Sequence, residues 1–119
     1  MYTYRAKLDR VVDGDTVDLF VDLGFNIWIK DRFRLLDIDT PELRGGTEQT
    51  KAAARKAKEF VENLFGQYNN ECEVLSQKDT KGKYGRWLAT IILVGNKEDS
   101  KEVNLNERLI EAGLAERIQ

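Results

Sequence analysis

Three short segments carry acidic and arginine side chains where a folded domain usually places apolar ones. They are VVDGDTVDLF at 11–20, FRLLDIDTPEL at 33–43 and GKYGRWLATI at 82–91. Each segment joins an apolar, strand-like pattern to a polar group at the end of the strand. A carboxylate in apolar surroundings is costly unless a cation or several hydrogen bonds compensate it. The acids and arginines are therefore expected to share one site, and such a site would suit a metal ion and a phosphate.

One aspartate and two arginines carry this expectation. Side chains alternate between the faces of a strand, so Asp15 shares a face with the apolar side chains that follow it. Arg34 has apolar neighbours on both sides, and Arg86 opens a nearly continuous apolar run. An arginine donates parallel hydrogen bonds to phosphate oxygens and stays charged in a desolvated cleft. The alternative is that each arginine pairs with a core carboxylate such as Asp39 and has only a structural role.

Carboxylates supply the candidate metal ligands. Hard divalent cations take carboxylate, carbonyl and water oxygens, so Asp15 and Asp39 would suit Mg²⁺ or Mn²⁺ with several waters. Asp13 precedes a glycine, and it either hydrogen-bonds the waters of such a site or caps a turn. Glu42 follows the only proline, which rigidifies the turn that aims it. The alternative for Glu42 is an exposed loop glutamate.

The composition removes several mechanisms. The chain has no histidine, which excludes a histidine base and a histidine-ligated zinc, and the single Cys72 excludes a thiolate cluster or an intramolecular disulfide. Carboxylate, arginine, lysine and tyrosine groups remain, together with a hard metal ion. The net charge is −2. Broad nucleic-acid-binding surfaces are usually basic, so this charge indicates weak, local engagement of nucleic acid.

Length and hydropathy predict one domain. The 119 residues are 41% hydrophobic and 34% charged, which is typical of a packed core under a solvated surface. There is no run of about 18 apolar residues, so no membrane association is expected. The first ten residues lack the features of a secretory leader, which predicts a cytoplasmic protein unless a leader was removed.

The expected elements position the polar groups at strand ends. Strands are predicted at 3–12, 15–22, 71–76 and 86–94, with one long strand at 25–38. A helix is predicted at 48–65, capped by Thr47 and stopped by Gly66, and another at about 106–112, capped by Asn106. The fold class is therefore mainly β with α. Five strands with two to three helices predict a Greek-key barrel of the OB type.

These motifs, taken in order, resemble the staphylococcal nuclease (thermonuclease) family over about residues 4–115. DGDT at 13–16, Arg34 five residues before DTPE at 39–42, KYGR at 83–86 and a last helix ending in GLA occur in the family order. The resemblance implies a single OB-fold nuclease domain over 1–119. It implies hydrolysis of DNA and RNA, single-stranded or frayed, at the 5′ P–O bond, leaving 3′-phosphate ends.

The resemblance also implies roles for individual residues. In the family two arginines hold the scissile phosphate and a glutamate orients or deprotonates the attacking water, and the matching residues are Arg34, Arg86 and Glu42. Oxygen ligands hold Ca²⁺, and the matching ligands are Asp15, Asp39 and the backbone carbonyl of Thr40, with Asp13 behind them. The terminal phosphate or nucleotide is contacted by residues that match Lys83 and Tyr84.

Two questions stay open at this point. The hairpin expected at 20–33 is longer than the family's, with Trp28 at an outward position, and its tip either reaches a substrate or partner or is an ordinary extended hairpin. The alternative function is a non-catalytic module that binds nucleic acid or protein, and a phosphodiesterase for another substrate is a third. Modules without activity usually lack some of the acids and arginines, whereas this chain keeps Asp15, Arg34, Asp39, Glu42 and Arg86. Their presence favours an enzyme, whereas its oligomeric state does not follow from the sequence.

Overall fold

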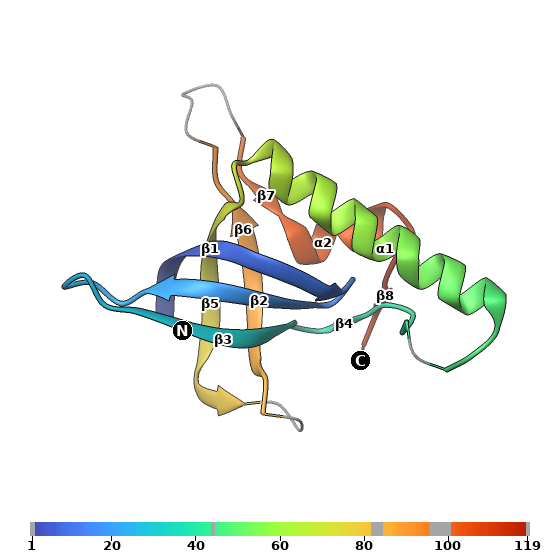
Figure 1. Ribbon diagram of the computed structural model, residues 1–119, viewed down its shortest axis with the longest axis horizontal. Helices are drawn as coiled ribbons and strands as arrows, with labels where there is room; N and C mark the ends of the chain where they lie inside the picture. The colour runs from blue at the N-terminus through green and yellow to red at the C-terminus, as the bar shows by residue number, and fades with distance from the viewer. Residues whose placement is uncertain (1, 44, 82–84, 96–100, 119) are drawn as a thin grey trace.

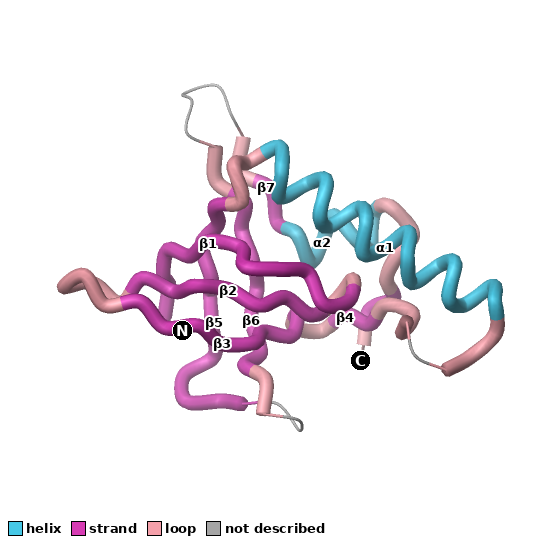
Figure 2. The backbone as a smooth tube through the Cα atoms, viewed as in Figure 1, coloured by secondary structure: helices cyan, strands magenta, loops and turns pink. Residues whose placement is uncertain are grey.

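The structure is a computed structural model that describes residues 2–43, 45–81, 85–95 and 101–118. It is mainly β, with two helices on one side of a barrel (Figures 1 and 2). The strands are β1 (Tyr2–Asp13), β2 (Thr16–Asp22), β3 (Trp28–Leu35), β4 (Ile38–Asp39), β5 (Glu71–Lys81), β6 (Trp87–Leu93), β7 (Val103–Asn104) and β8 (Glu116–Arg117). The helices are α1 (Glu48–Gln67) and α2 (Leu105–Glu111).

Pairing between distant strands closes the barrel. The strands lie in the order β3-β2-β1-β5-β6, and the neighbours in this order are antiparallel. A parallel pairing of residues 33–35 with 87–89 joins β3 to β6 and completes the ring. Strand β7 continues the sheet beside β6, while β4 and β8 form a separate two-stranded pair. This closed five-stranded barrel confirms the predicted OB-type fold.

Alternation along β2 separates an inner from an outer face. Val17, Leu19 and Val21 are buried in the core, whereas Phe20 between them is 39% exposed. Helix α1 packs its buried side, including Val61 and Phe65, against the barrel. Cross-strand partners share a face, so the register assigns the partners of Phe20 to the outer face.

Helix α1 begins as expected and ends later than expected. The side chain of Thr47 accepts a hydrogen bond from the Thr50 N–H at 3.2 Å, which confirms the predicted N-cap. Gly66 does not stop the helix, which runs on to Gln67. The chain turns instead at Asn69 and Asn70, whose φ angles are 58° and 60°. Asparagine tolerates this left-handed region better than most residues, so it takes the role that was assigned to the glycine.

The long third strand predicted at 25–38 is wrong. Phe25 and Asn26 have φ angles of 54° and 60° and form the turn between β2 and β3. Asp37, with φ of 63°, separates β3 from β4. A positive φ is incompatible with an extended strand, so the continuous apolar pattern conceals a hairpin turn at Phe25–Asn26 and a break at Asp37.

Asn106 is a core residue and not the cap of α2. It is 5% exposed, and its amide accepts a hydrogen bond from the Ile91 N–H and donates to the carbonyls of Leu36 and Ala89, all at 3.1 Å. The cap is Asn104, which accepts from the Glu107 N–H. Buried polar groups require such partners, and Asn106 thereby fastens α2 to the barrel wall.

Two further expectations concern membrane-spanning helices and the state of the single cysteine. Neither helix within the described ranges is long and apolar enough to cross a bilayer. Cys72 is a free, buried thiol whose pKa is raised to about 12, first by burial and second by the charge of Glu73. Little thiolate forms at neutral pH in a buried thiol with this pKa, so Cys72 has low reactivity.

Candidate active site

Asp15 lies in the tight turn between β1 and β2 and is 5% exposed, as the sequence pattern indicates. Gly14 lets this turn approach α1 closely. A Cβ at position 14 would lie 2.6 Å from the Cβ of Ala57 and 3.1 Å from the hydroxyl of Thr40. A side chain at position 14 would therefore push the turn away from the helix. Gly14 of the DGDT motif thus allows Asp15 to remain buried in the turn that packs against α1.

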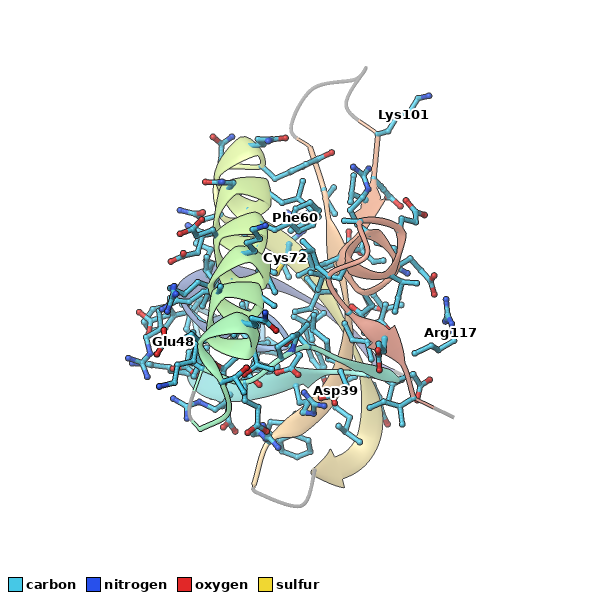
Figure 3. The ribbon with its side chains drawn as sticks, turned by 90° about the vertical axis from the view of Figure 1, so that its right-hand side faces the viewer. Asp39, Glu48, Phe60, Cys72, Lys101 and Arg117 are labelled. Carbon is cyan, nitrogen blue, oxygen red and sulfur yellow. The ribbon has the colours of Figure 1, made fainter. Side chains whose placement is uncertain are left out.

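Arg34 connects the two aspartates that were expected to bind metal. Its Nη1 forms an ion pair with Asp15, and its Nη2 donates to Asp39 Oδ1 at 2.9 Å and to the Ile38 carbonyl at 3.2 Å. Such contacts are expected under the alternative in which the arginine pairs with a core carboxylate such as Asp39 and has only a structural role. Asp39 (labelled in Figure 3) is not a core carboxylate, however, because its side chain is 59% exposed.

Arg86 reaches the same site through Thr16. Its Nη1 lies 3.4 Å from the hydroxyl of Thr16, which in turn donates to Asp15 Oδ1 at 3.0 Å. The sequence reasoning did not single out Thr16, although its place as the last residue of the DGDT motif was a usable signal. The barrel thus connects Arg86, Thr16, Asp15, Arg34 and Asp39 in one continuous network.

The protonation of Asp15 follows from this network. Burial raises the pKa of the carboxyl, but hydrogen bonds from Arg34, from the Thr40 N–H at 3.1 Å and from Thr16 outweigh it. The pKa of Asp15 is therefore held below its ordinary 3.8. Burial lowers the pKa of the Arg34 guanidinium, but its contacts with Asp15 and Asp39 outweigh this effect and raise it. Both groups are charged at neutral pH.

Asp13 and Glu42 lie beside this network and interact with it through their charges. The pKa of Asp13 is raised by burial and then by the charges of Asp15 and Glu42. The Leu43 N–H and the charge of Lys58 oppose the increase. This repulsion shows that negative charge accumulates at the turn. Glu42 itself is exposed, as a residue that contacts solvent water must be.

The donor set fits a hard divalent cation. Asp15 and Asp39 direct carboxylate oxygens toward one guanidinium, and Thr40, which is 4% exposed, has a buried hydroxyl without a hydrogen-bond partner in the described part of the chain. That part holds no cluster of three or more acidic or cysteine side chains suited to one ion. Main-chain oxygens and waters would therefore complete the coordination.

Two of the expected substrate contacts lie outside the described residues. Lys83 and Tyr84 belong to the stretch 82–84, which the structure does not describe. The five residues on which the enzyme hypothesis depends are all described. Asp15, Arg34, Asp39 and Arg86 belong to one network, and Glu42 lies beside it through Asp13.

Comparisons with known proteins identify the family of the chain. A family model described as staphylococcal nuclease homologue matches residues 32–119, which include Arg34, Asp39, Glu42 and Arg86. An uncharacterized protein of Methanocaldococcus jannaschii, MJ1439, is 32% identical over 94% of this chain and 58% of its own length. Protein ParB of Escherichia coli is 34% identical over 73% of this chain and 41% of its own length. The chain thus spans about half the length of these relatives.

Proposed function

The chain belongs to the staphylococcal nuclease family, and from that membership we propose that residues 1–119 form one metal-dependent nuclease domain. It hydrolyses phosphodiester bonds of DNA and RNA and leaves 3′-phosphate ends. The observation that carries this proposal is the network in which Arg34 of β3 contacts Asp15 directly and Arg86, just before β6, reaches it through Thr16. Family membership alone supports a nuclease or a nucleic-acid-binding module, and the network favours the nuclease.

Two arginines with different constraints would hold the scissile phosphate. Asp15 fixes one nitrogen of Arg34, while the other nitrogen bonds an exposed carboxylate, Asp39, that a phosphate oxygen can replace. Arg86 offers a second guanidinium held by the Thr16 hydroxyl. Negative charge grows on the phosphate oxygens as water attacks, so donors already fixed there lower the barrier.

Glu42 is the residue proposed to orient or deprotonate the attacking water. It is exposed, follows Pro41 and lies close enough to Asp13 to raise the pKa of that carboxyl. The Leu43 N–H lowers the pKa of Asp13, so the segment bearing Glu42 lies beside the β1–β2 turn. Asp13 thus acts as a positioning residue for the base rather than as a base.

The proposed metal ligands are Asp15, Asp39 and the carbonyl of Thr40, with Ca²⁺ as the first candidate and Mg²⁺ or Mn²⁺ as alternatives. A bound divalent cation would act as a Lewis acid on the phosphoryl group and offset negative charge at the site. Asp15 would hold its position through the Thr40 N–H and Thr16 hydrogen bonds in either state.

Cleavage assays test the proposal. Purified protein would be incubated with single-stranded DNA or RNA, with Ca²⁺ or a chelator, beside Glu42→Gln and Arg86→Ala. We expect Ca²⁺-dependent cleavage that falls by about 10²–10⁴-fold in both variants. The matched controls are Glu59→Gln and Arg55→Ala, two exposed α1 residues that should retain full activity. Circular dichroism would establish that every variant is folded.

The second candidate is a module that binds nucleic acid without cleaving it. One observation favours it, because Arg34 already pairs with both Asp15 and Asp39. Binding without cleavage under Ca²⁺, Mg²⁺ and Mn²⁺ would select this candidate and reject the nuclease.

A further inference from the structure

The outer face of β1, β2 and β3 carries side chains in rows that lead away from the site. Thr16 and Arg34 form the row at the site. The following rows, toward the β2–β3 hairpin, are Arg10–Asp18–Arg32, Lys7–Phe20–Lys30 and Asp22–Trp28. In Figure 1 this hairpin extends from the barrel on the side opposite to β4. We call these side chains the outer rows.

The first of the rows beyond the site holds two arginines on one acid. Arg32 bonds Asp18 through two nitrogens, at 2.7 and 3.1 Å, and Arg10 bonds the same carboxylate at 3.1 Å. Asp18 is 6% exposed, whereas the side chains of Arg32 and Arg10 are 43% and 62% exposed. The buried acid thus fixes two guanidinium groups whose remaining donors face solvent, and cations exceed acids in this row.

The next rows alternate cations with exposed aromatic rings. Phe20 is 39% and Trp28 45% exposed, which is unusual for large rings on a barrel wall. Lys30 Nζ lies 5.8 Å from the ring centre of Phe20, and Lys7 Nζ lies 5.6 Å from that of Trp28. Lys30 also forms an ion pair with Asp9 at 3.0 Å, and because its side chain is 55% exposed a phosphate oxygen can replace this carboxylate. Basic groups interleaved with aromatic faces are typical of surfaces that bind single-stranded nucleic acid, because phosphates contact the cations and bases stack on the rings.

A cleft occupies the far end of the rows. Its volume is about 440 Å³, which is in the range of small-molecule pockets. Trp28 lines it, together with charged residues of both signs, Arg5, Lys7, Asp22, Glu71 and Glu73. The carboxylates would repel a phosphate, but they can accept hydrogen bonds from the amino groups of bases. The cleft therefore matches a base rather than a phosphate.

We propose that the outer rows and this cleft form an extended track for single-stranded nucleic acid. Phosphates contact Arg10, Lys30 and Arg32, and a base stacks on Trp28 inside the cleft. Arg34 lies six positions after Trp28 along β3, so the base lies about 20 Å from the scissile phosphate. The catalytic end of the track rests on the proposed function, whereas the binding surface does not.

Equilibrium binding tests the track without turnover. The Glu42→Gln protein, with Ca²⁺ present, would be titrated with labelled single strands of about eight and about two nucleotides, and anisotropy would be followed. We expect Trp28→Ala in this background to raise the Kd of the longer strand about ten-fold and to reduce the preference for length. The matched control is Phe25→Ala, at the hairpin tip, 96% exposed and outside the cleft lining, which should change neither Kd.

Salt dependence tests the phosphate contacts. The slope of log K against log salt should fall by about 0.7 in Lys30→Gln, since one phosphate contact of a single strand is lost. An unchanged slope in Lys30→Gln, a Kd that Trp28→Ala does not alter, or an equal loss in Phe25→Ala would overturn the proposal.

Other outcomes separate the track from its alternatives. Binding that needs Trp28, in a parent protein that cleaves nothing, would support the track and reject the nuclease. A concentration-dependent dimer in sedimentation, abolished by Trp28→Ala and accompanied by no binding of nucleic acid, would assign this face to a second copy of the chain and overturn the track. Circular dichroism of each variant would show that the barrel is intact.

Discussion

Two clusters of acids and arginines lie next to each other along β2 and β3, and their charges are balanced in opposite ways. In the row Arg10–Asp18–Arg32, two cations share one acid, and all three lie in cross-strand register. At the site, Arg34 and Arg86 face a larger group of acids, Asp13, Asp15, Asp39 and Glu42.

The pKa values reveal the consequence of this difference. Hydrogen bonds from Arg32 lower the pKa of Asp18 more than burial raises it, with Arg10 adding to the effect. Asp13 at the site has a raised pKa, because burial and its acidic neighbours are not compensated. Arg10, Asp18 and Arg32 satisfy one another, whereas the surplus carboxylates at the site would suit the proposed cation. Burial acts on both carboxyls, and the sign of the neighbouring charges distinguishes the site from the row.

The largest expected effect is a loss of catalytic activity when an arginine of the site is changed. Arg34→Lys retains the charge but loses the planar fork, so kcat/KM should fall about 100-fold or more. Arg108→Lys, an exposed change on α2, serves as the control and should stay within about two-fold of the parent. Initial rates on single-stranded DNA measure both. A loss below about ten-fold for Arg34→Lys would show that charge alone suffices at the site.

The next largest effect is on the free energy of unfolding, which should fall more when the acid of the site is changed than when the acid of the row is changed. Asp15 is buried with a largely buried partner, so Asp15→Asn should lower the free energy of unfolding by about 3 kcal/mol. The partners of Asp18 are exposed, so Asp18→Asn should cost about 1 kcal/mol. Urea unfolding near neutral pH measures the two values. Equal losses would contradict the distinction that is drawn from partner exposure.

The pH dependence of these two contributions has the same sign. Both carboxyls have folded pKa values below the ordinary 3.8, so their stabilisation is complete above that value. It should be lost as the pH falls below 3.8 through the folded pKa values.

A divalent cation should stabilise only through the site. At a Ca²⁺ concentration of about 100 times Kd, the free energy of unfolding should rise by about 2.7 kcal/mol. Asp39→Asn should abolish most of this increase, and Glu62→Gln, an exposed change on α1, should retain it. Thermal unfolding with and without Ca²⁺ gives the comparison, and it needs no activity. An increase that survives in Asp39→Asn would place the ion elsewhere.

The smallest expected effect is a gain in the free energy of unfolding, opposite in sign to the losses expected for Asp15→Asn and Asp18→Asn. Because the folded pKa of Asp13 is raised, its ionised form opposes folding, and the parent protein gains stability as the pH falls through that pKa. Asp13→Asn should therefore stabilise the apo protein near pH 7 by a few tenths of a kcal/mol, reduced by solvent screening. Urea unfolding near pH 7 and near pH 4 would measure it. A loss of stability at the higher pH would indicate that the hydrogen bond to Leu43 outweighs the repulsion.

Much of the fold follows from local pattern. Alternation in β2 predicts its inner row, and Thr47 is correctly identified as a cap, because both depend on a few neighbouring residues. The failures occur where a backbone angle or a long-range partner decides. Asp37 ends β3 at a positive φ that the apolar pattern does not reveal. Asn106 resembles a cap in sequence, yet it is buried by strands that no local window contains.

The candidate site divides along the same line. The sequence by itself determined the residue types, the buried position of Asp15 and the short spacing in sequence between Arg34 and Asp39. The position of Asp15 depends on strand periodicity, and the spacing of Arg34 and Asp39 spans only a short turn. Only the tertiary structure brought Arg86 to Thr16, 70 residues away, and placed Arg10 and Arg32 on Asp18. The physical reason is barrel closure. The parallel pairing of β3 with β6 and the register of β1, β2 and β3 are satisfied by backbone hydrogen bonds between distant segments, and no short stretch of sequence specifies them.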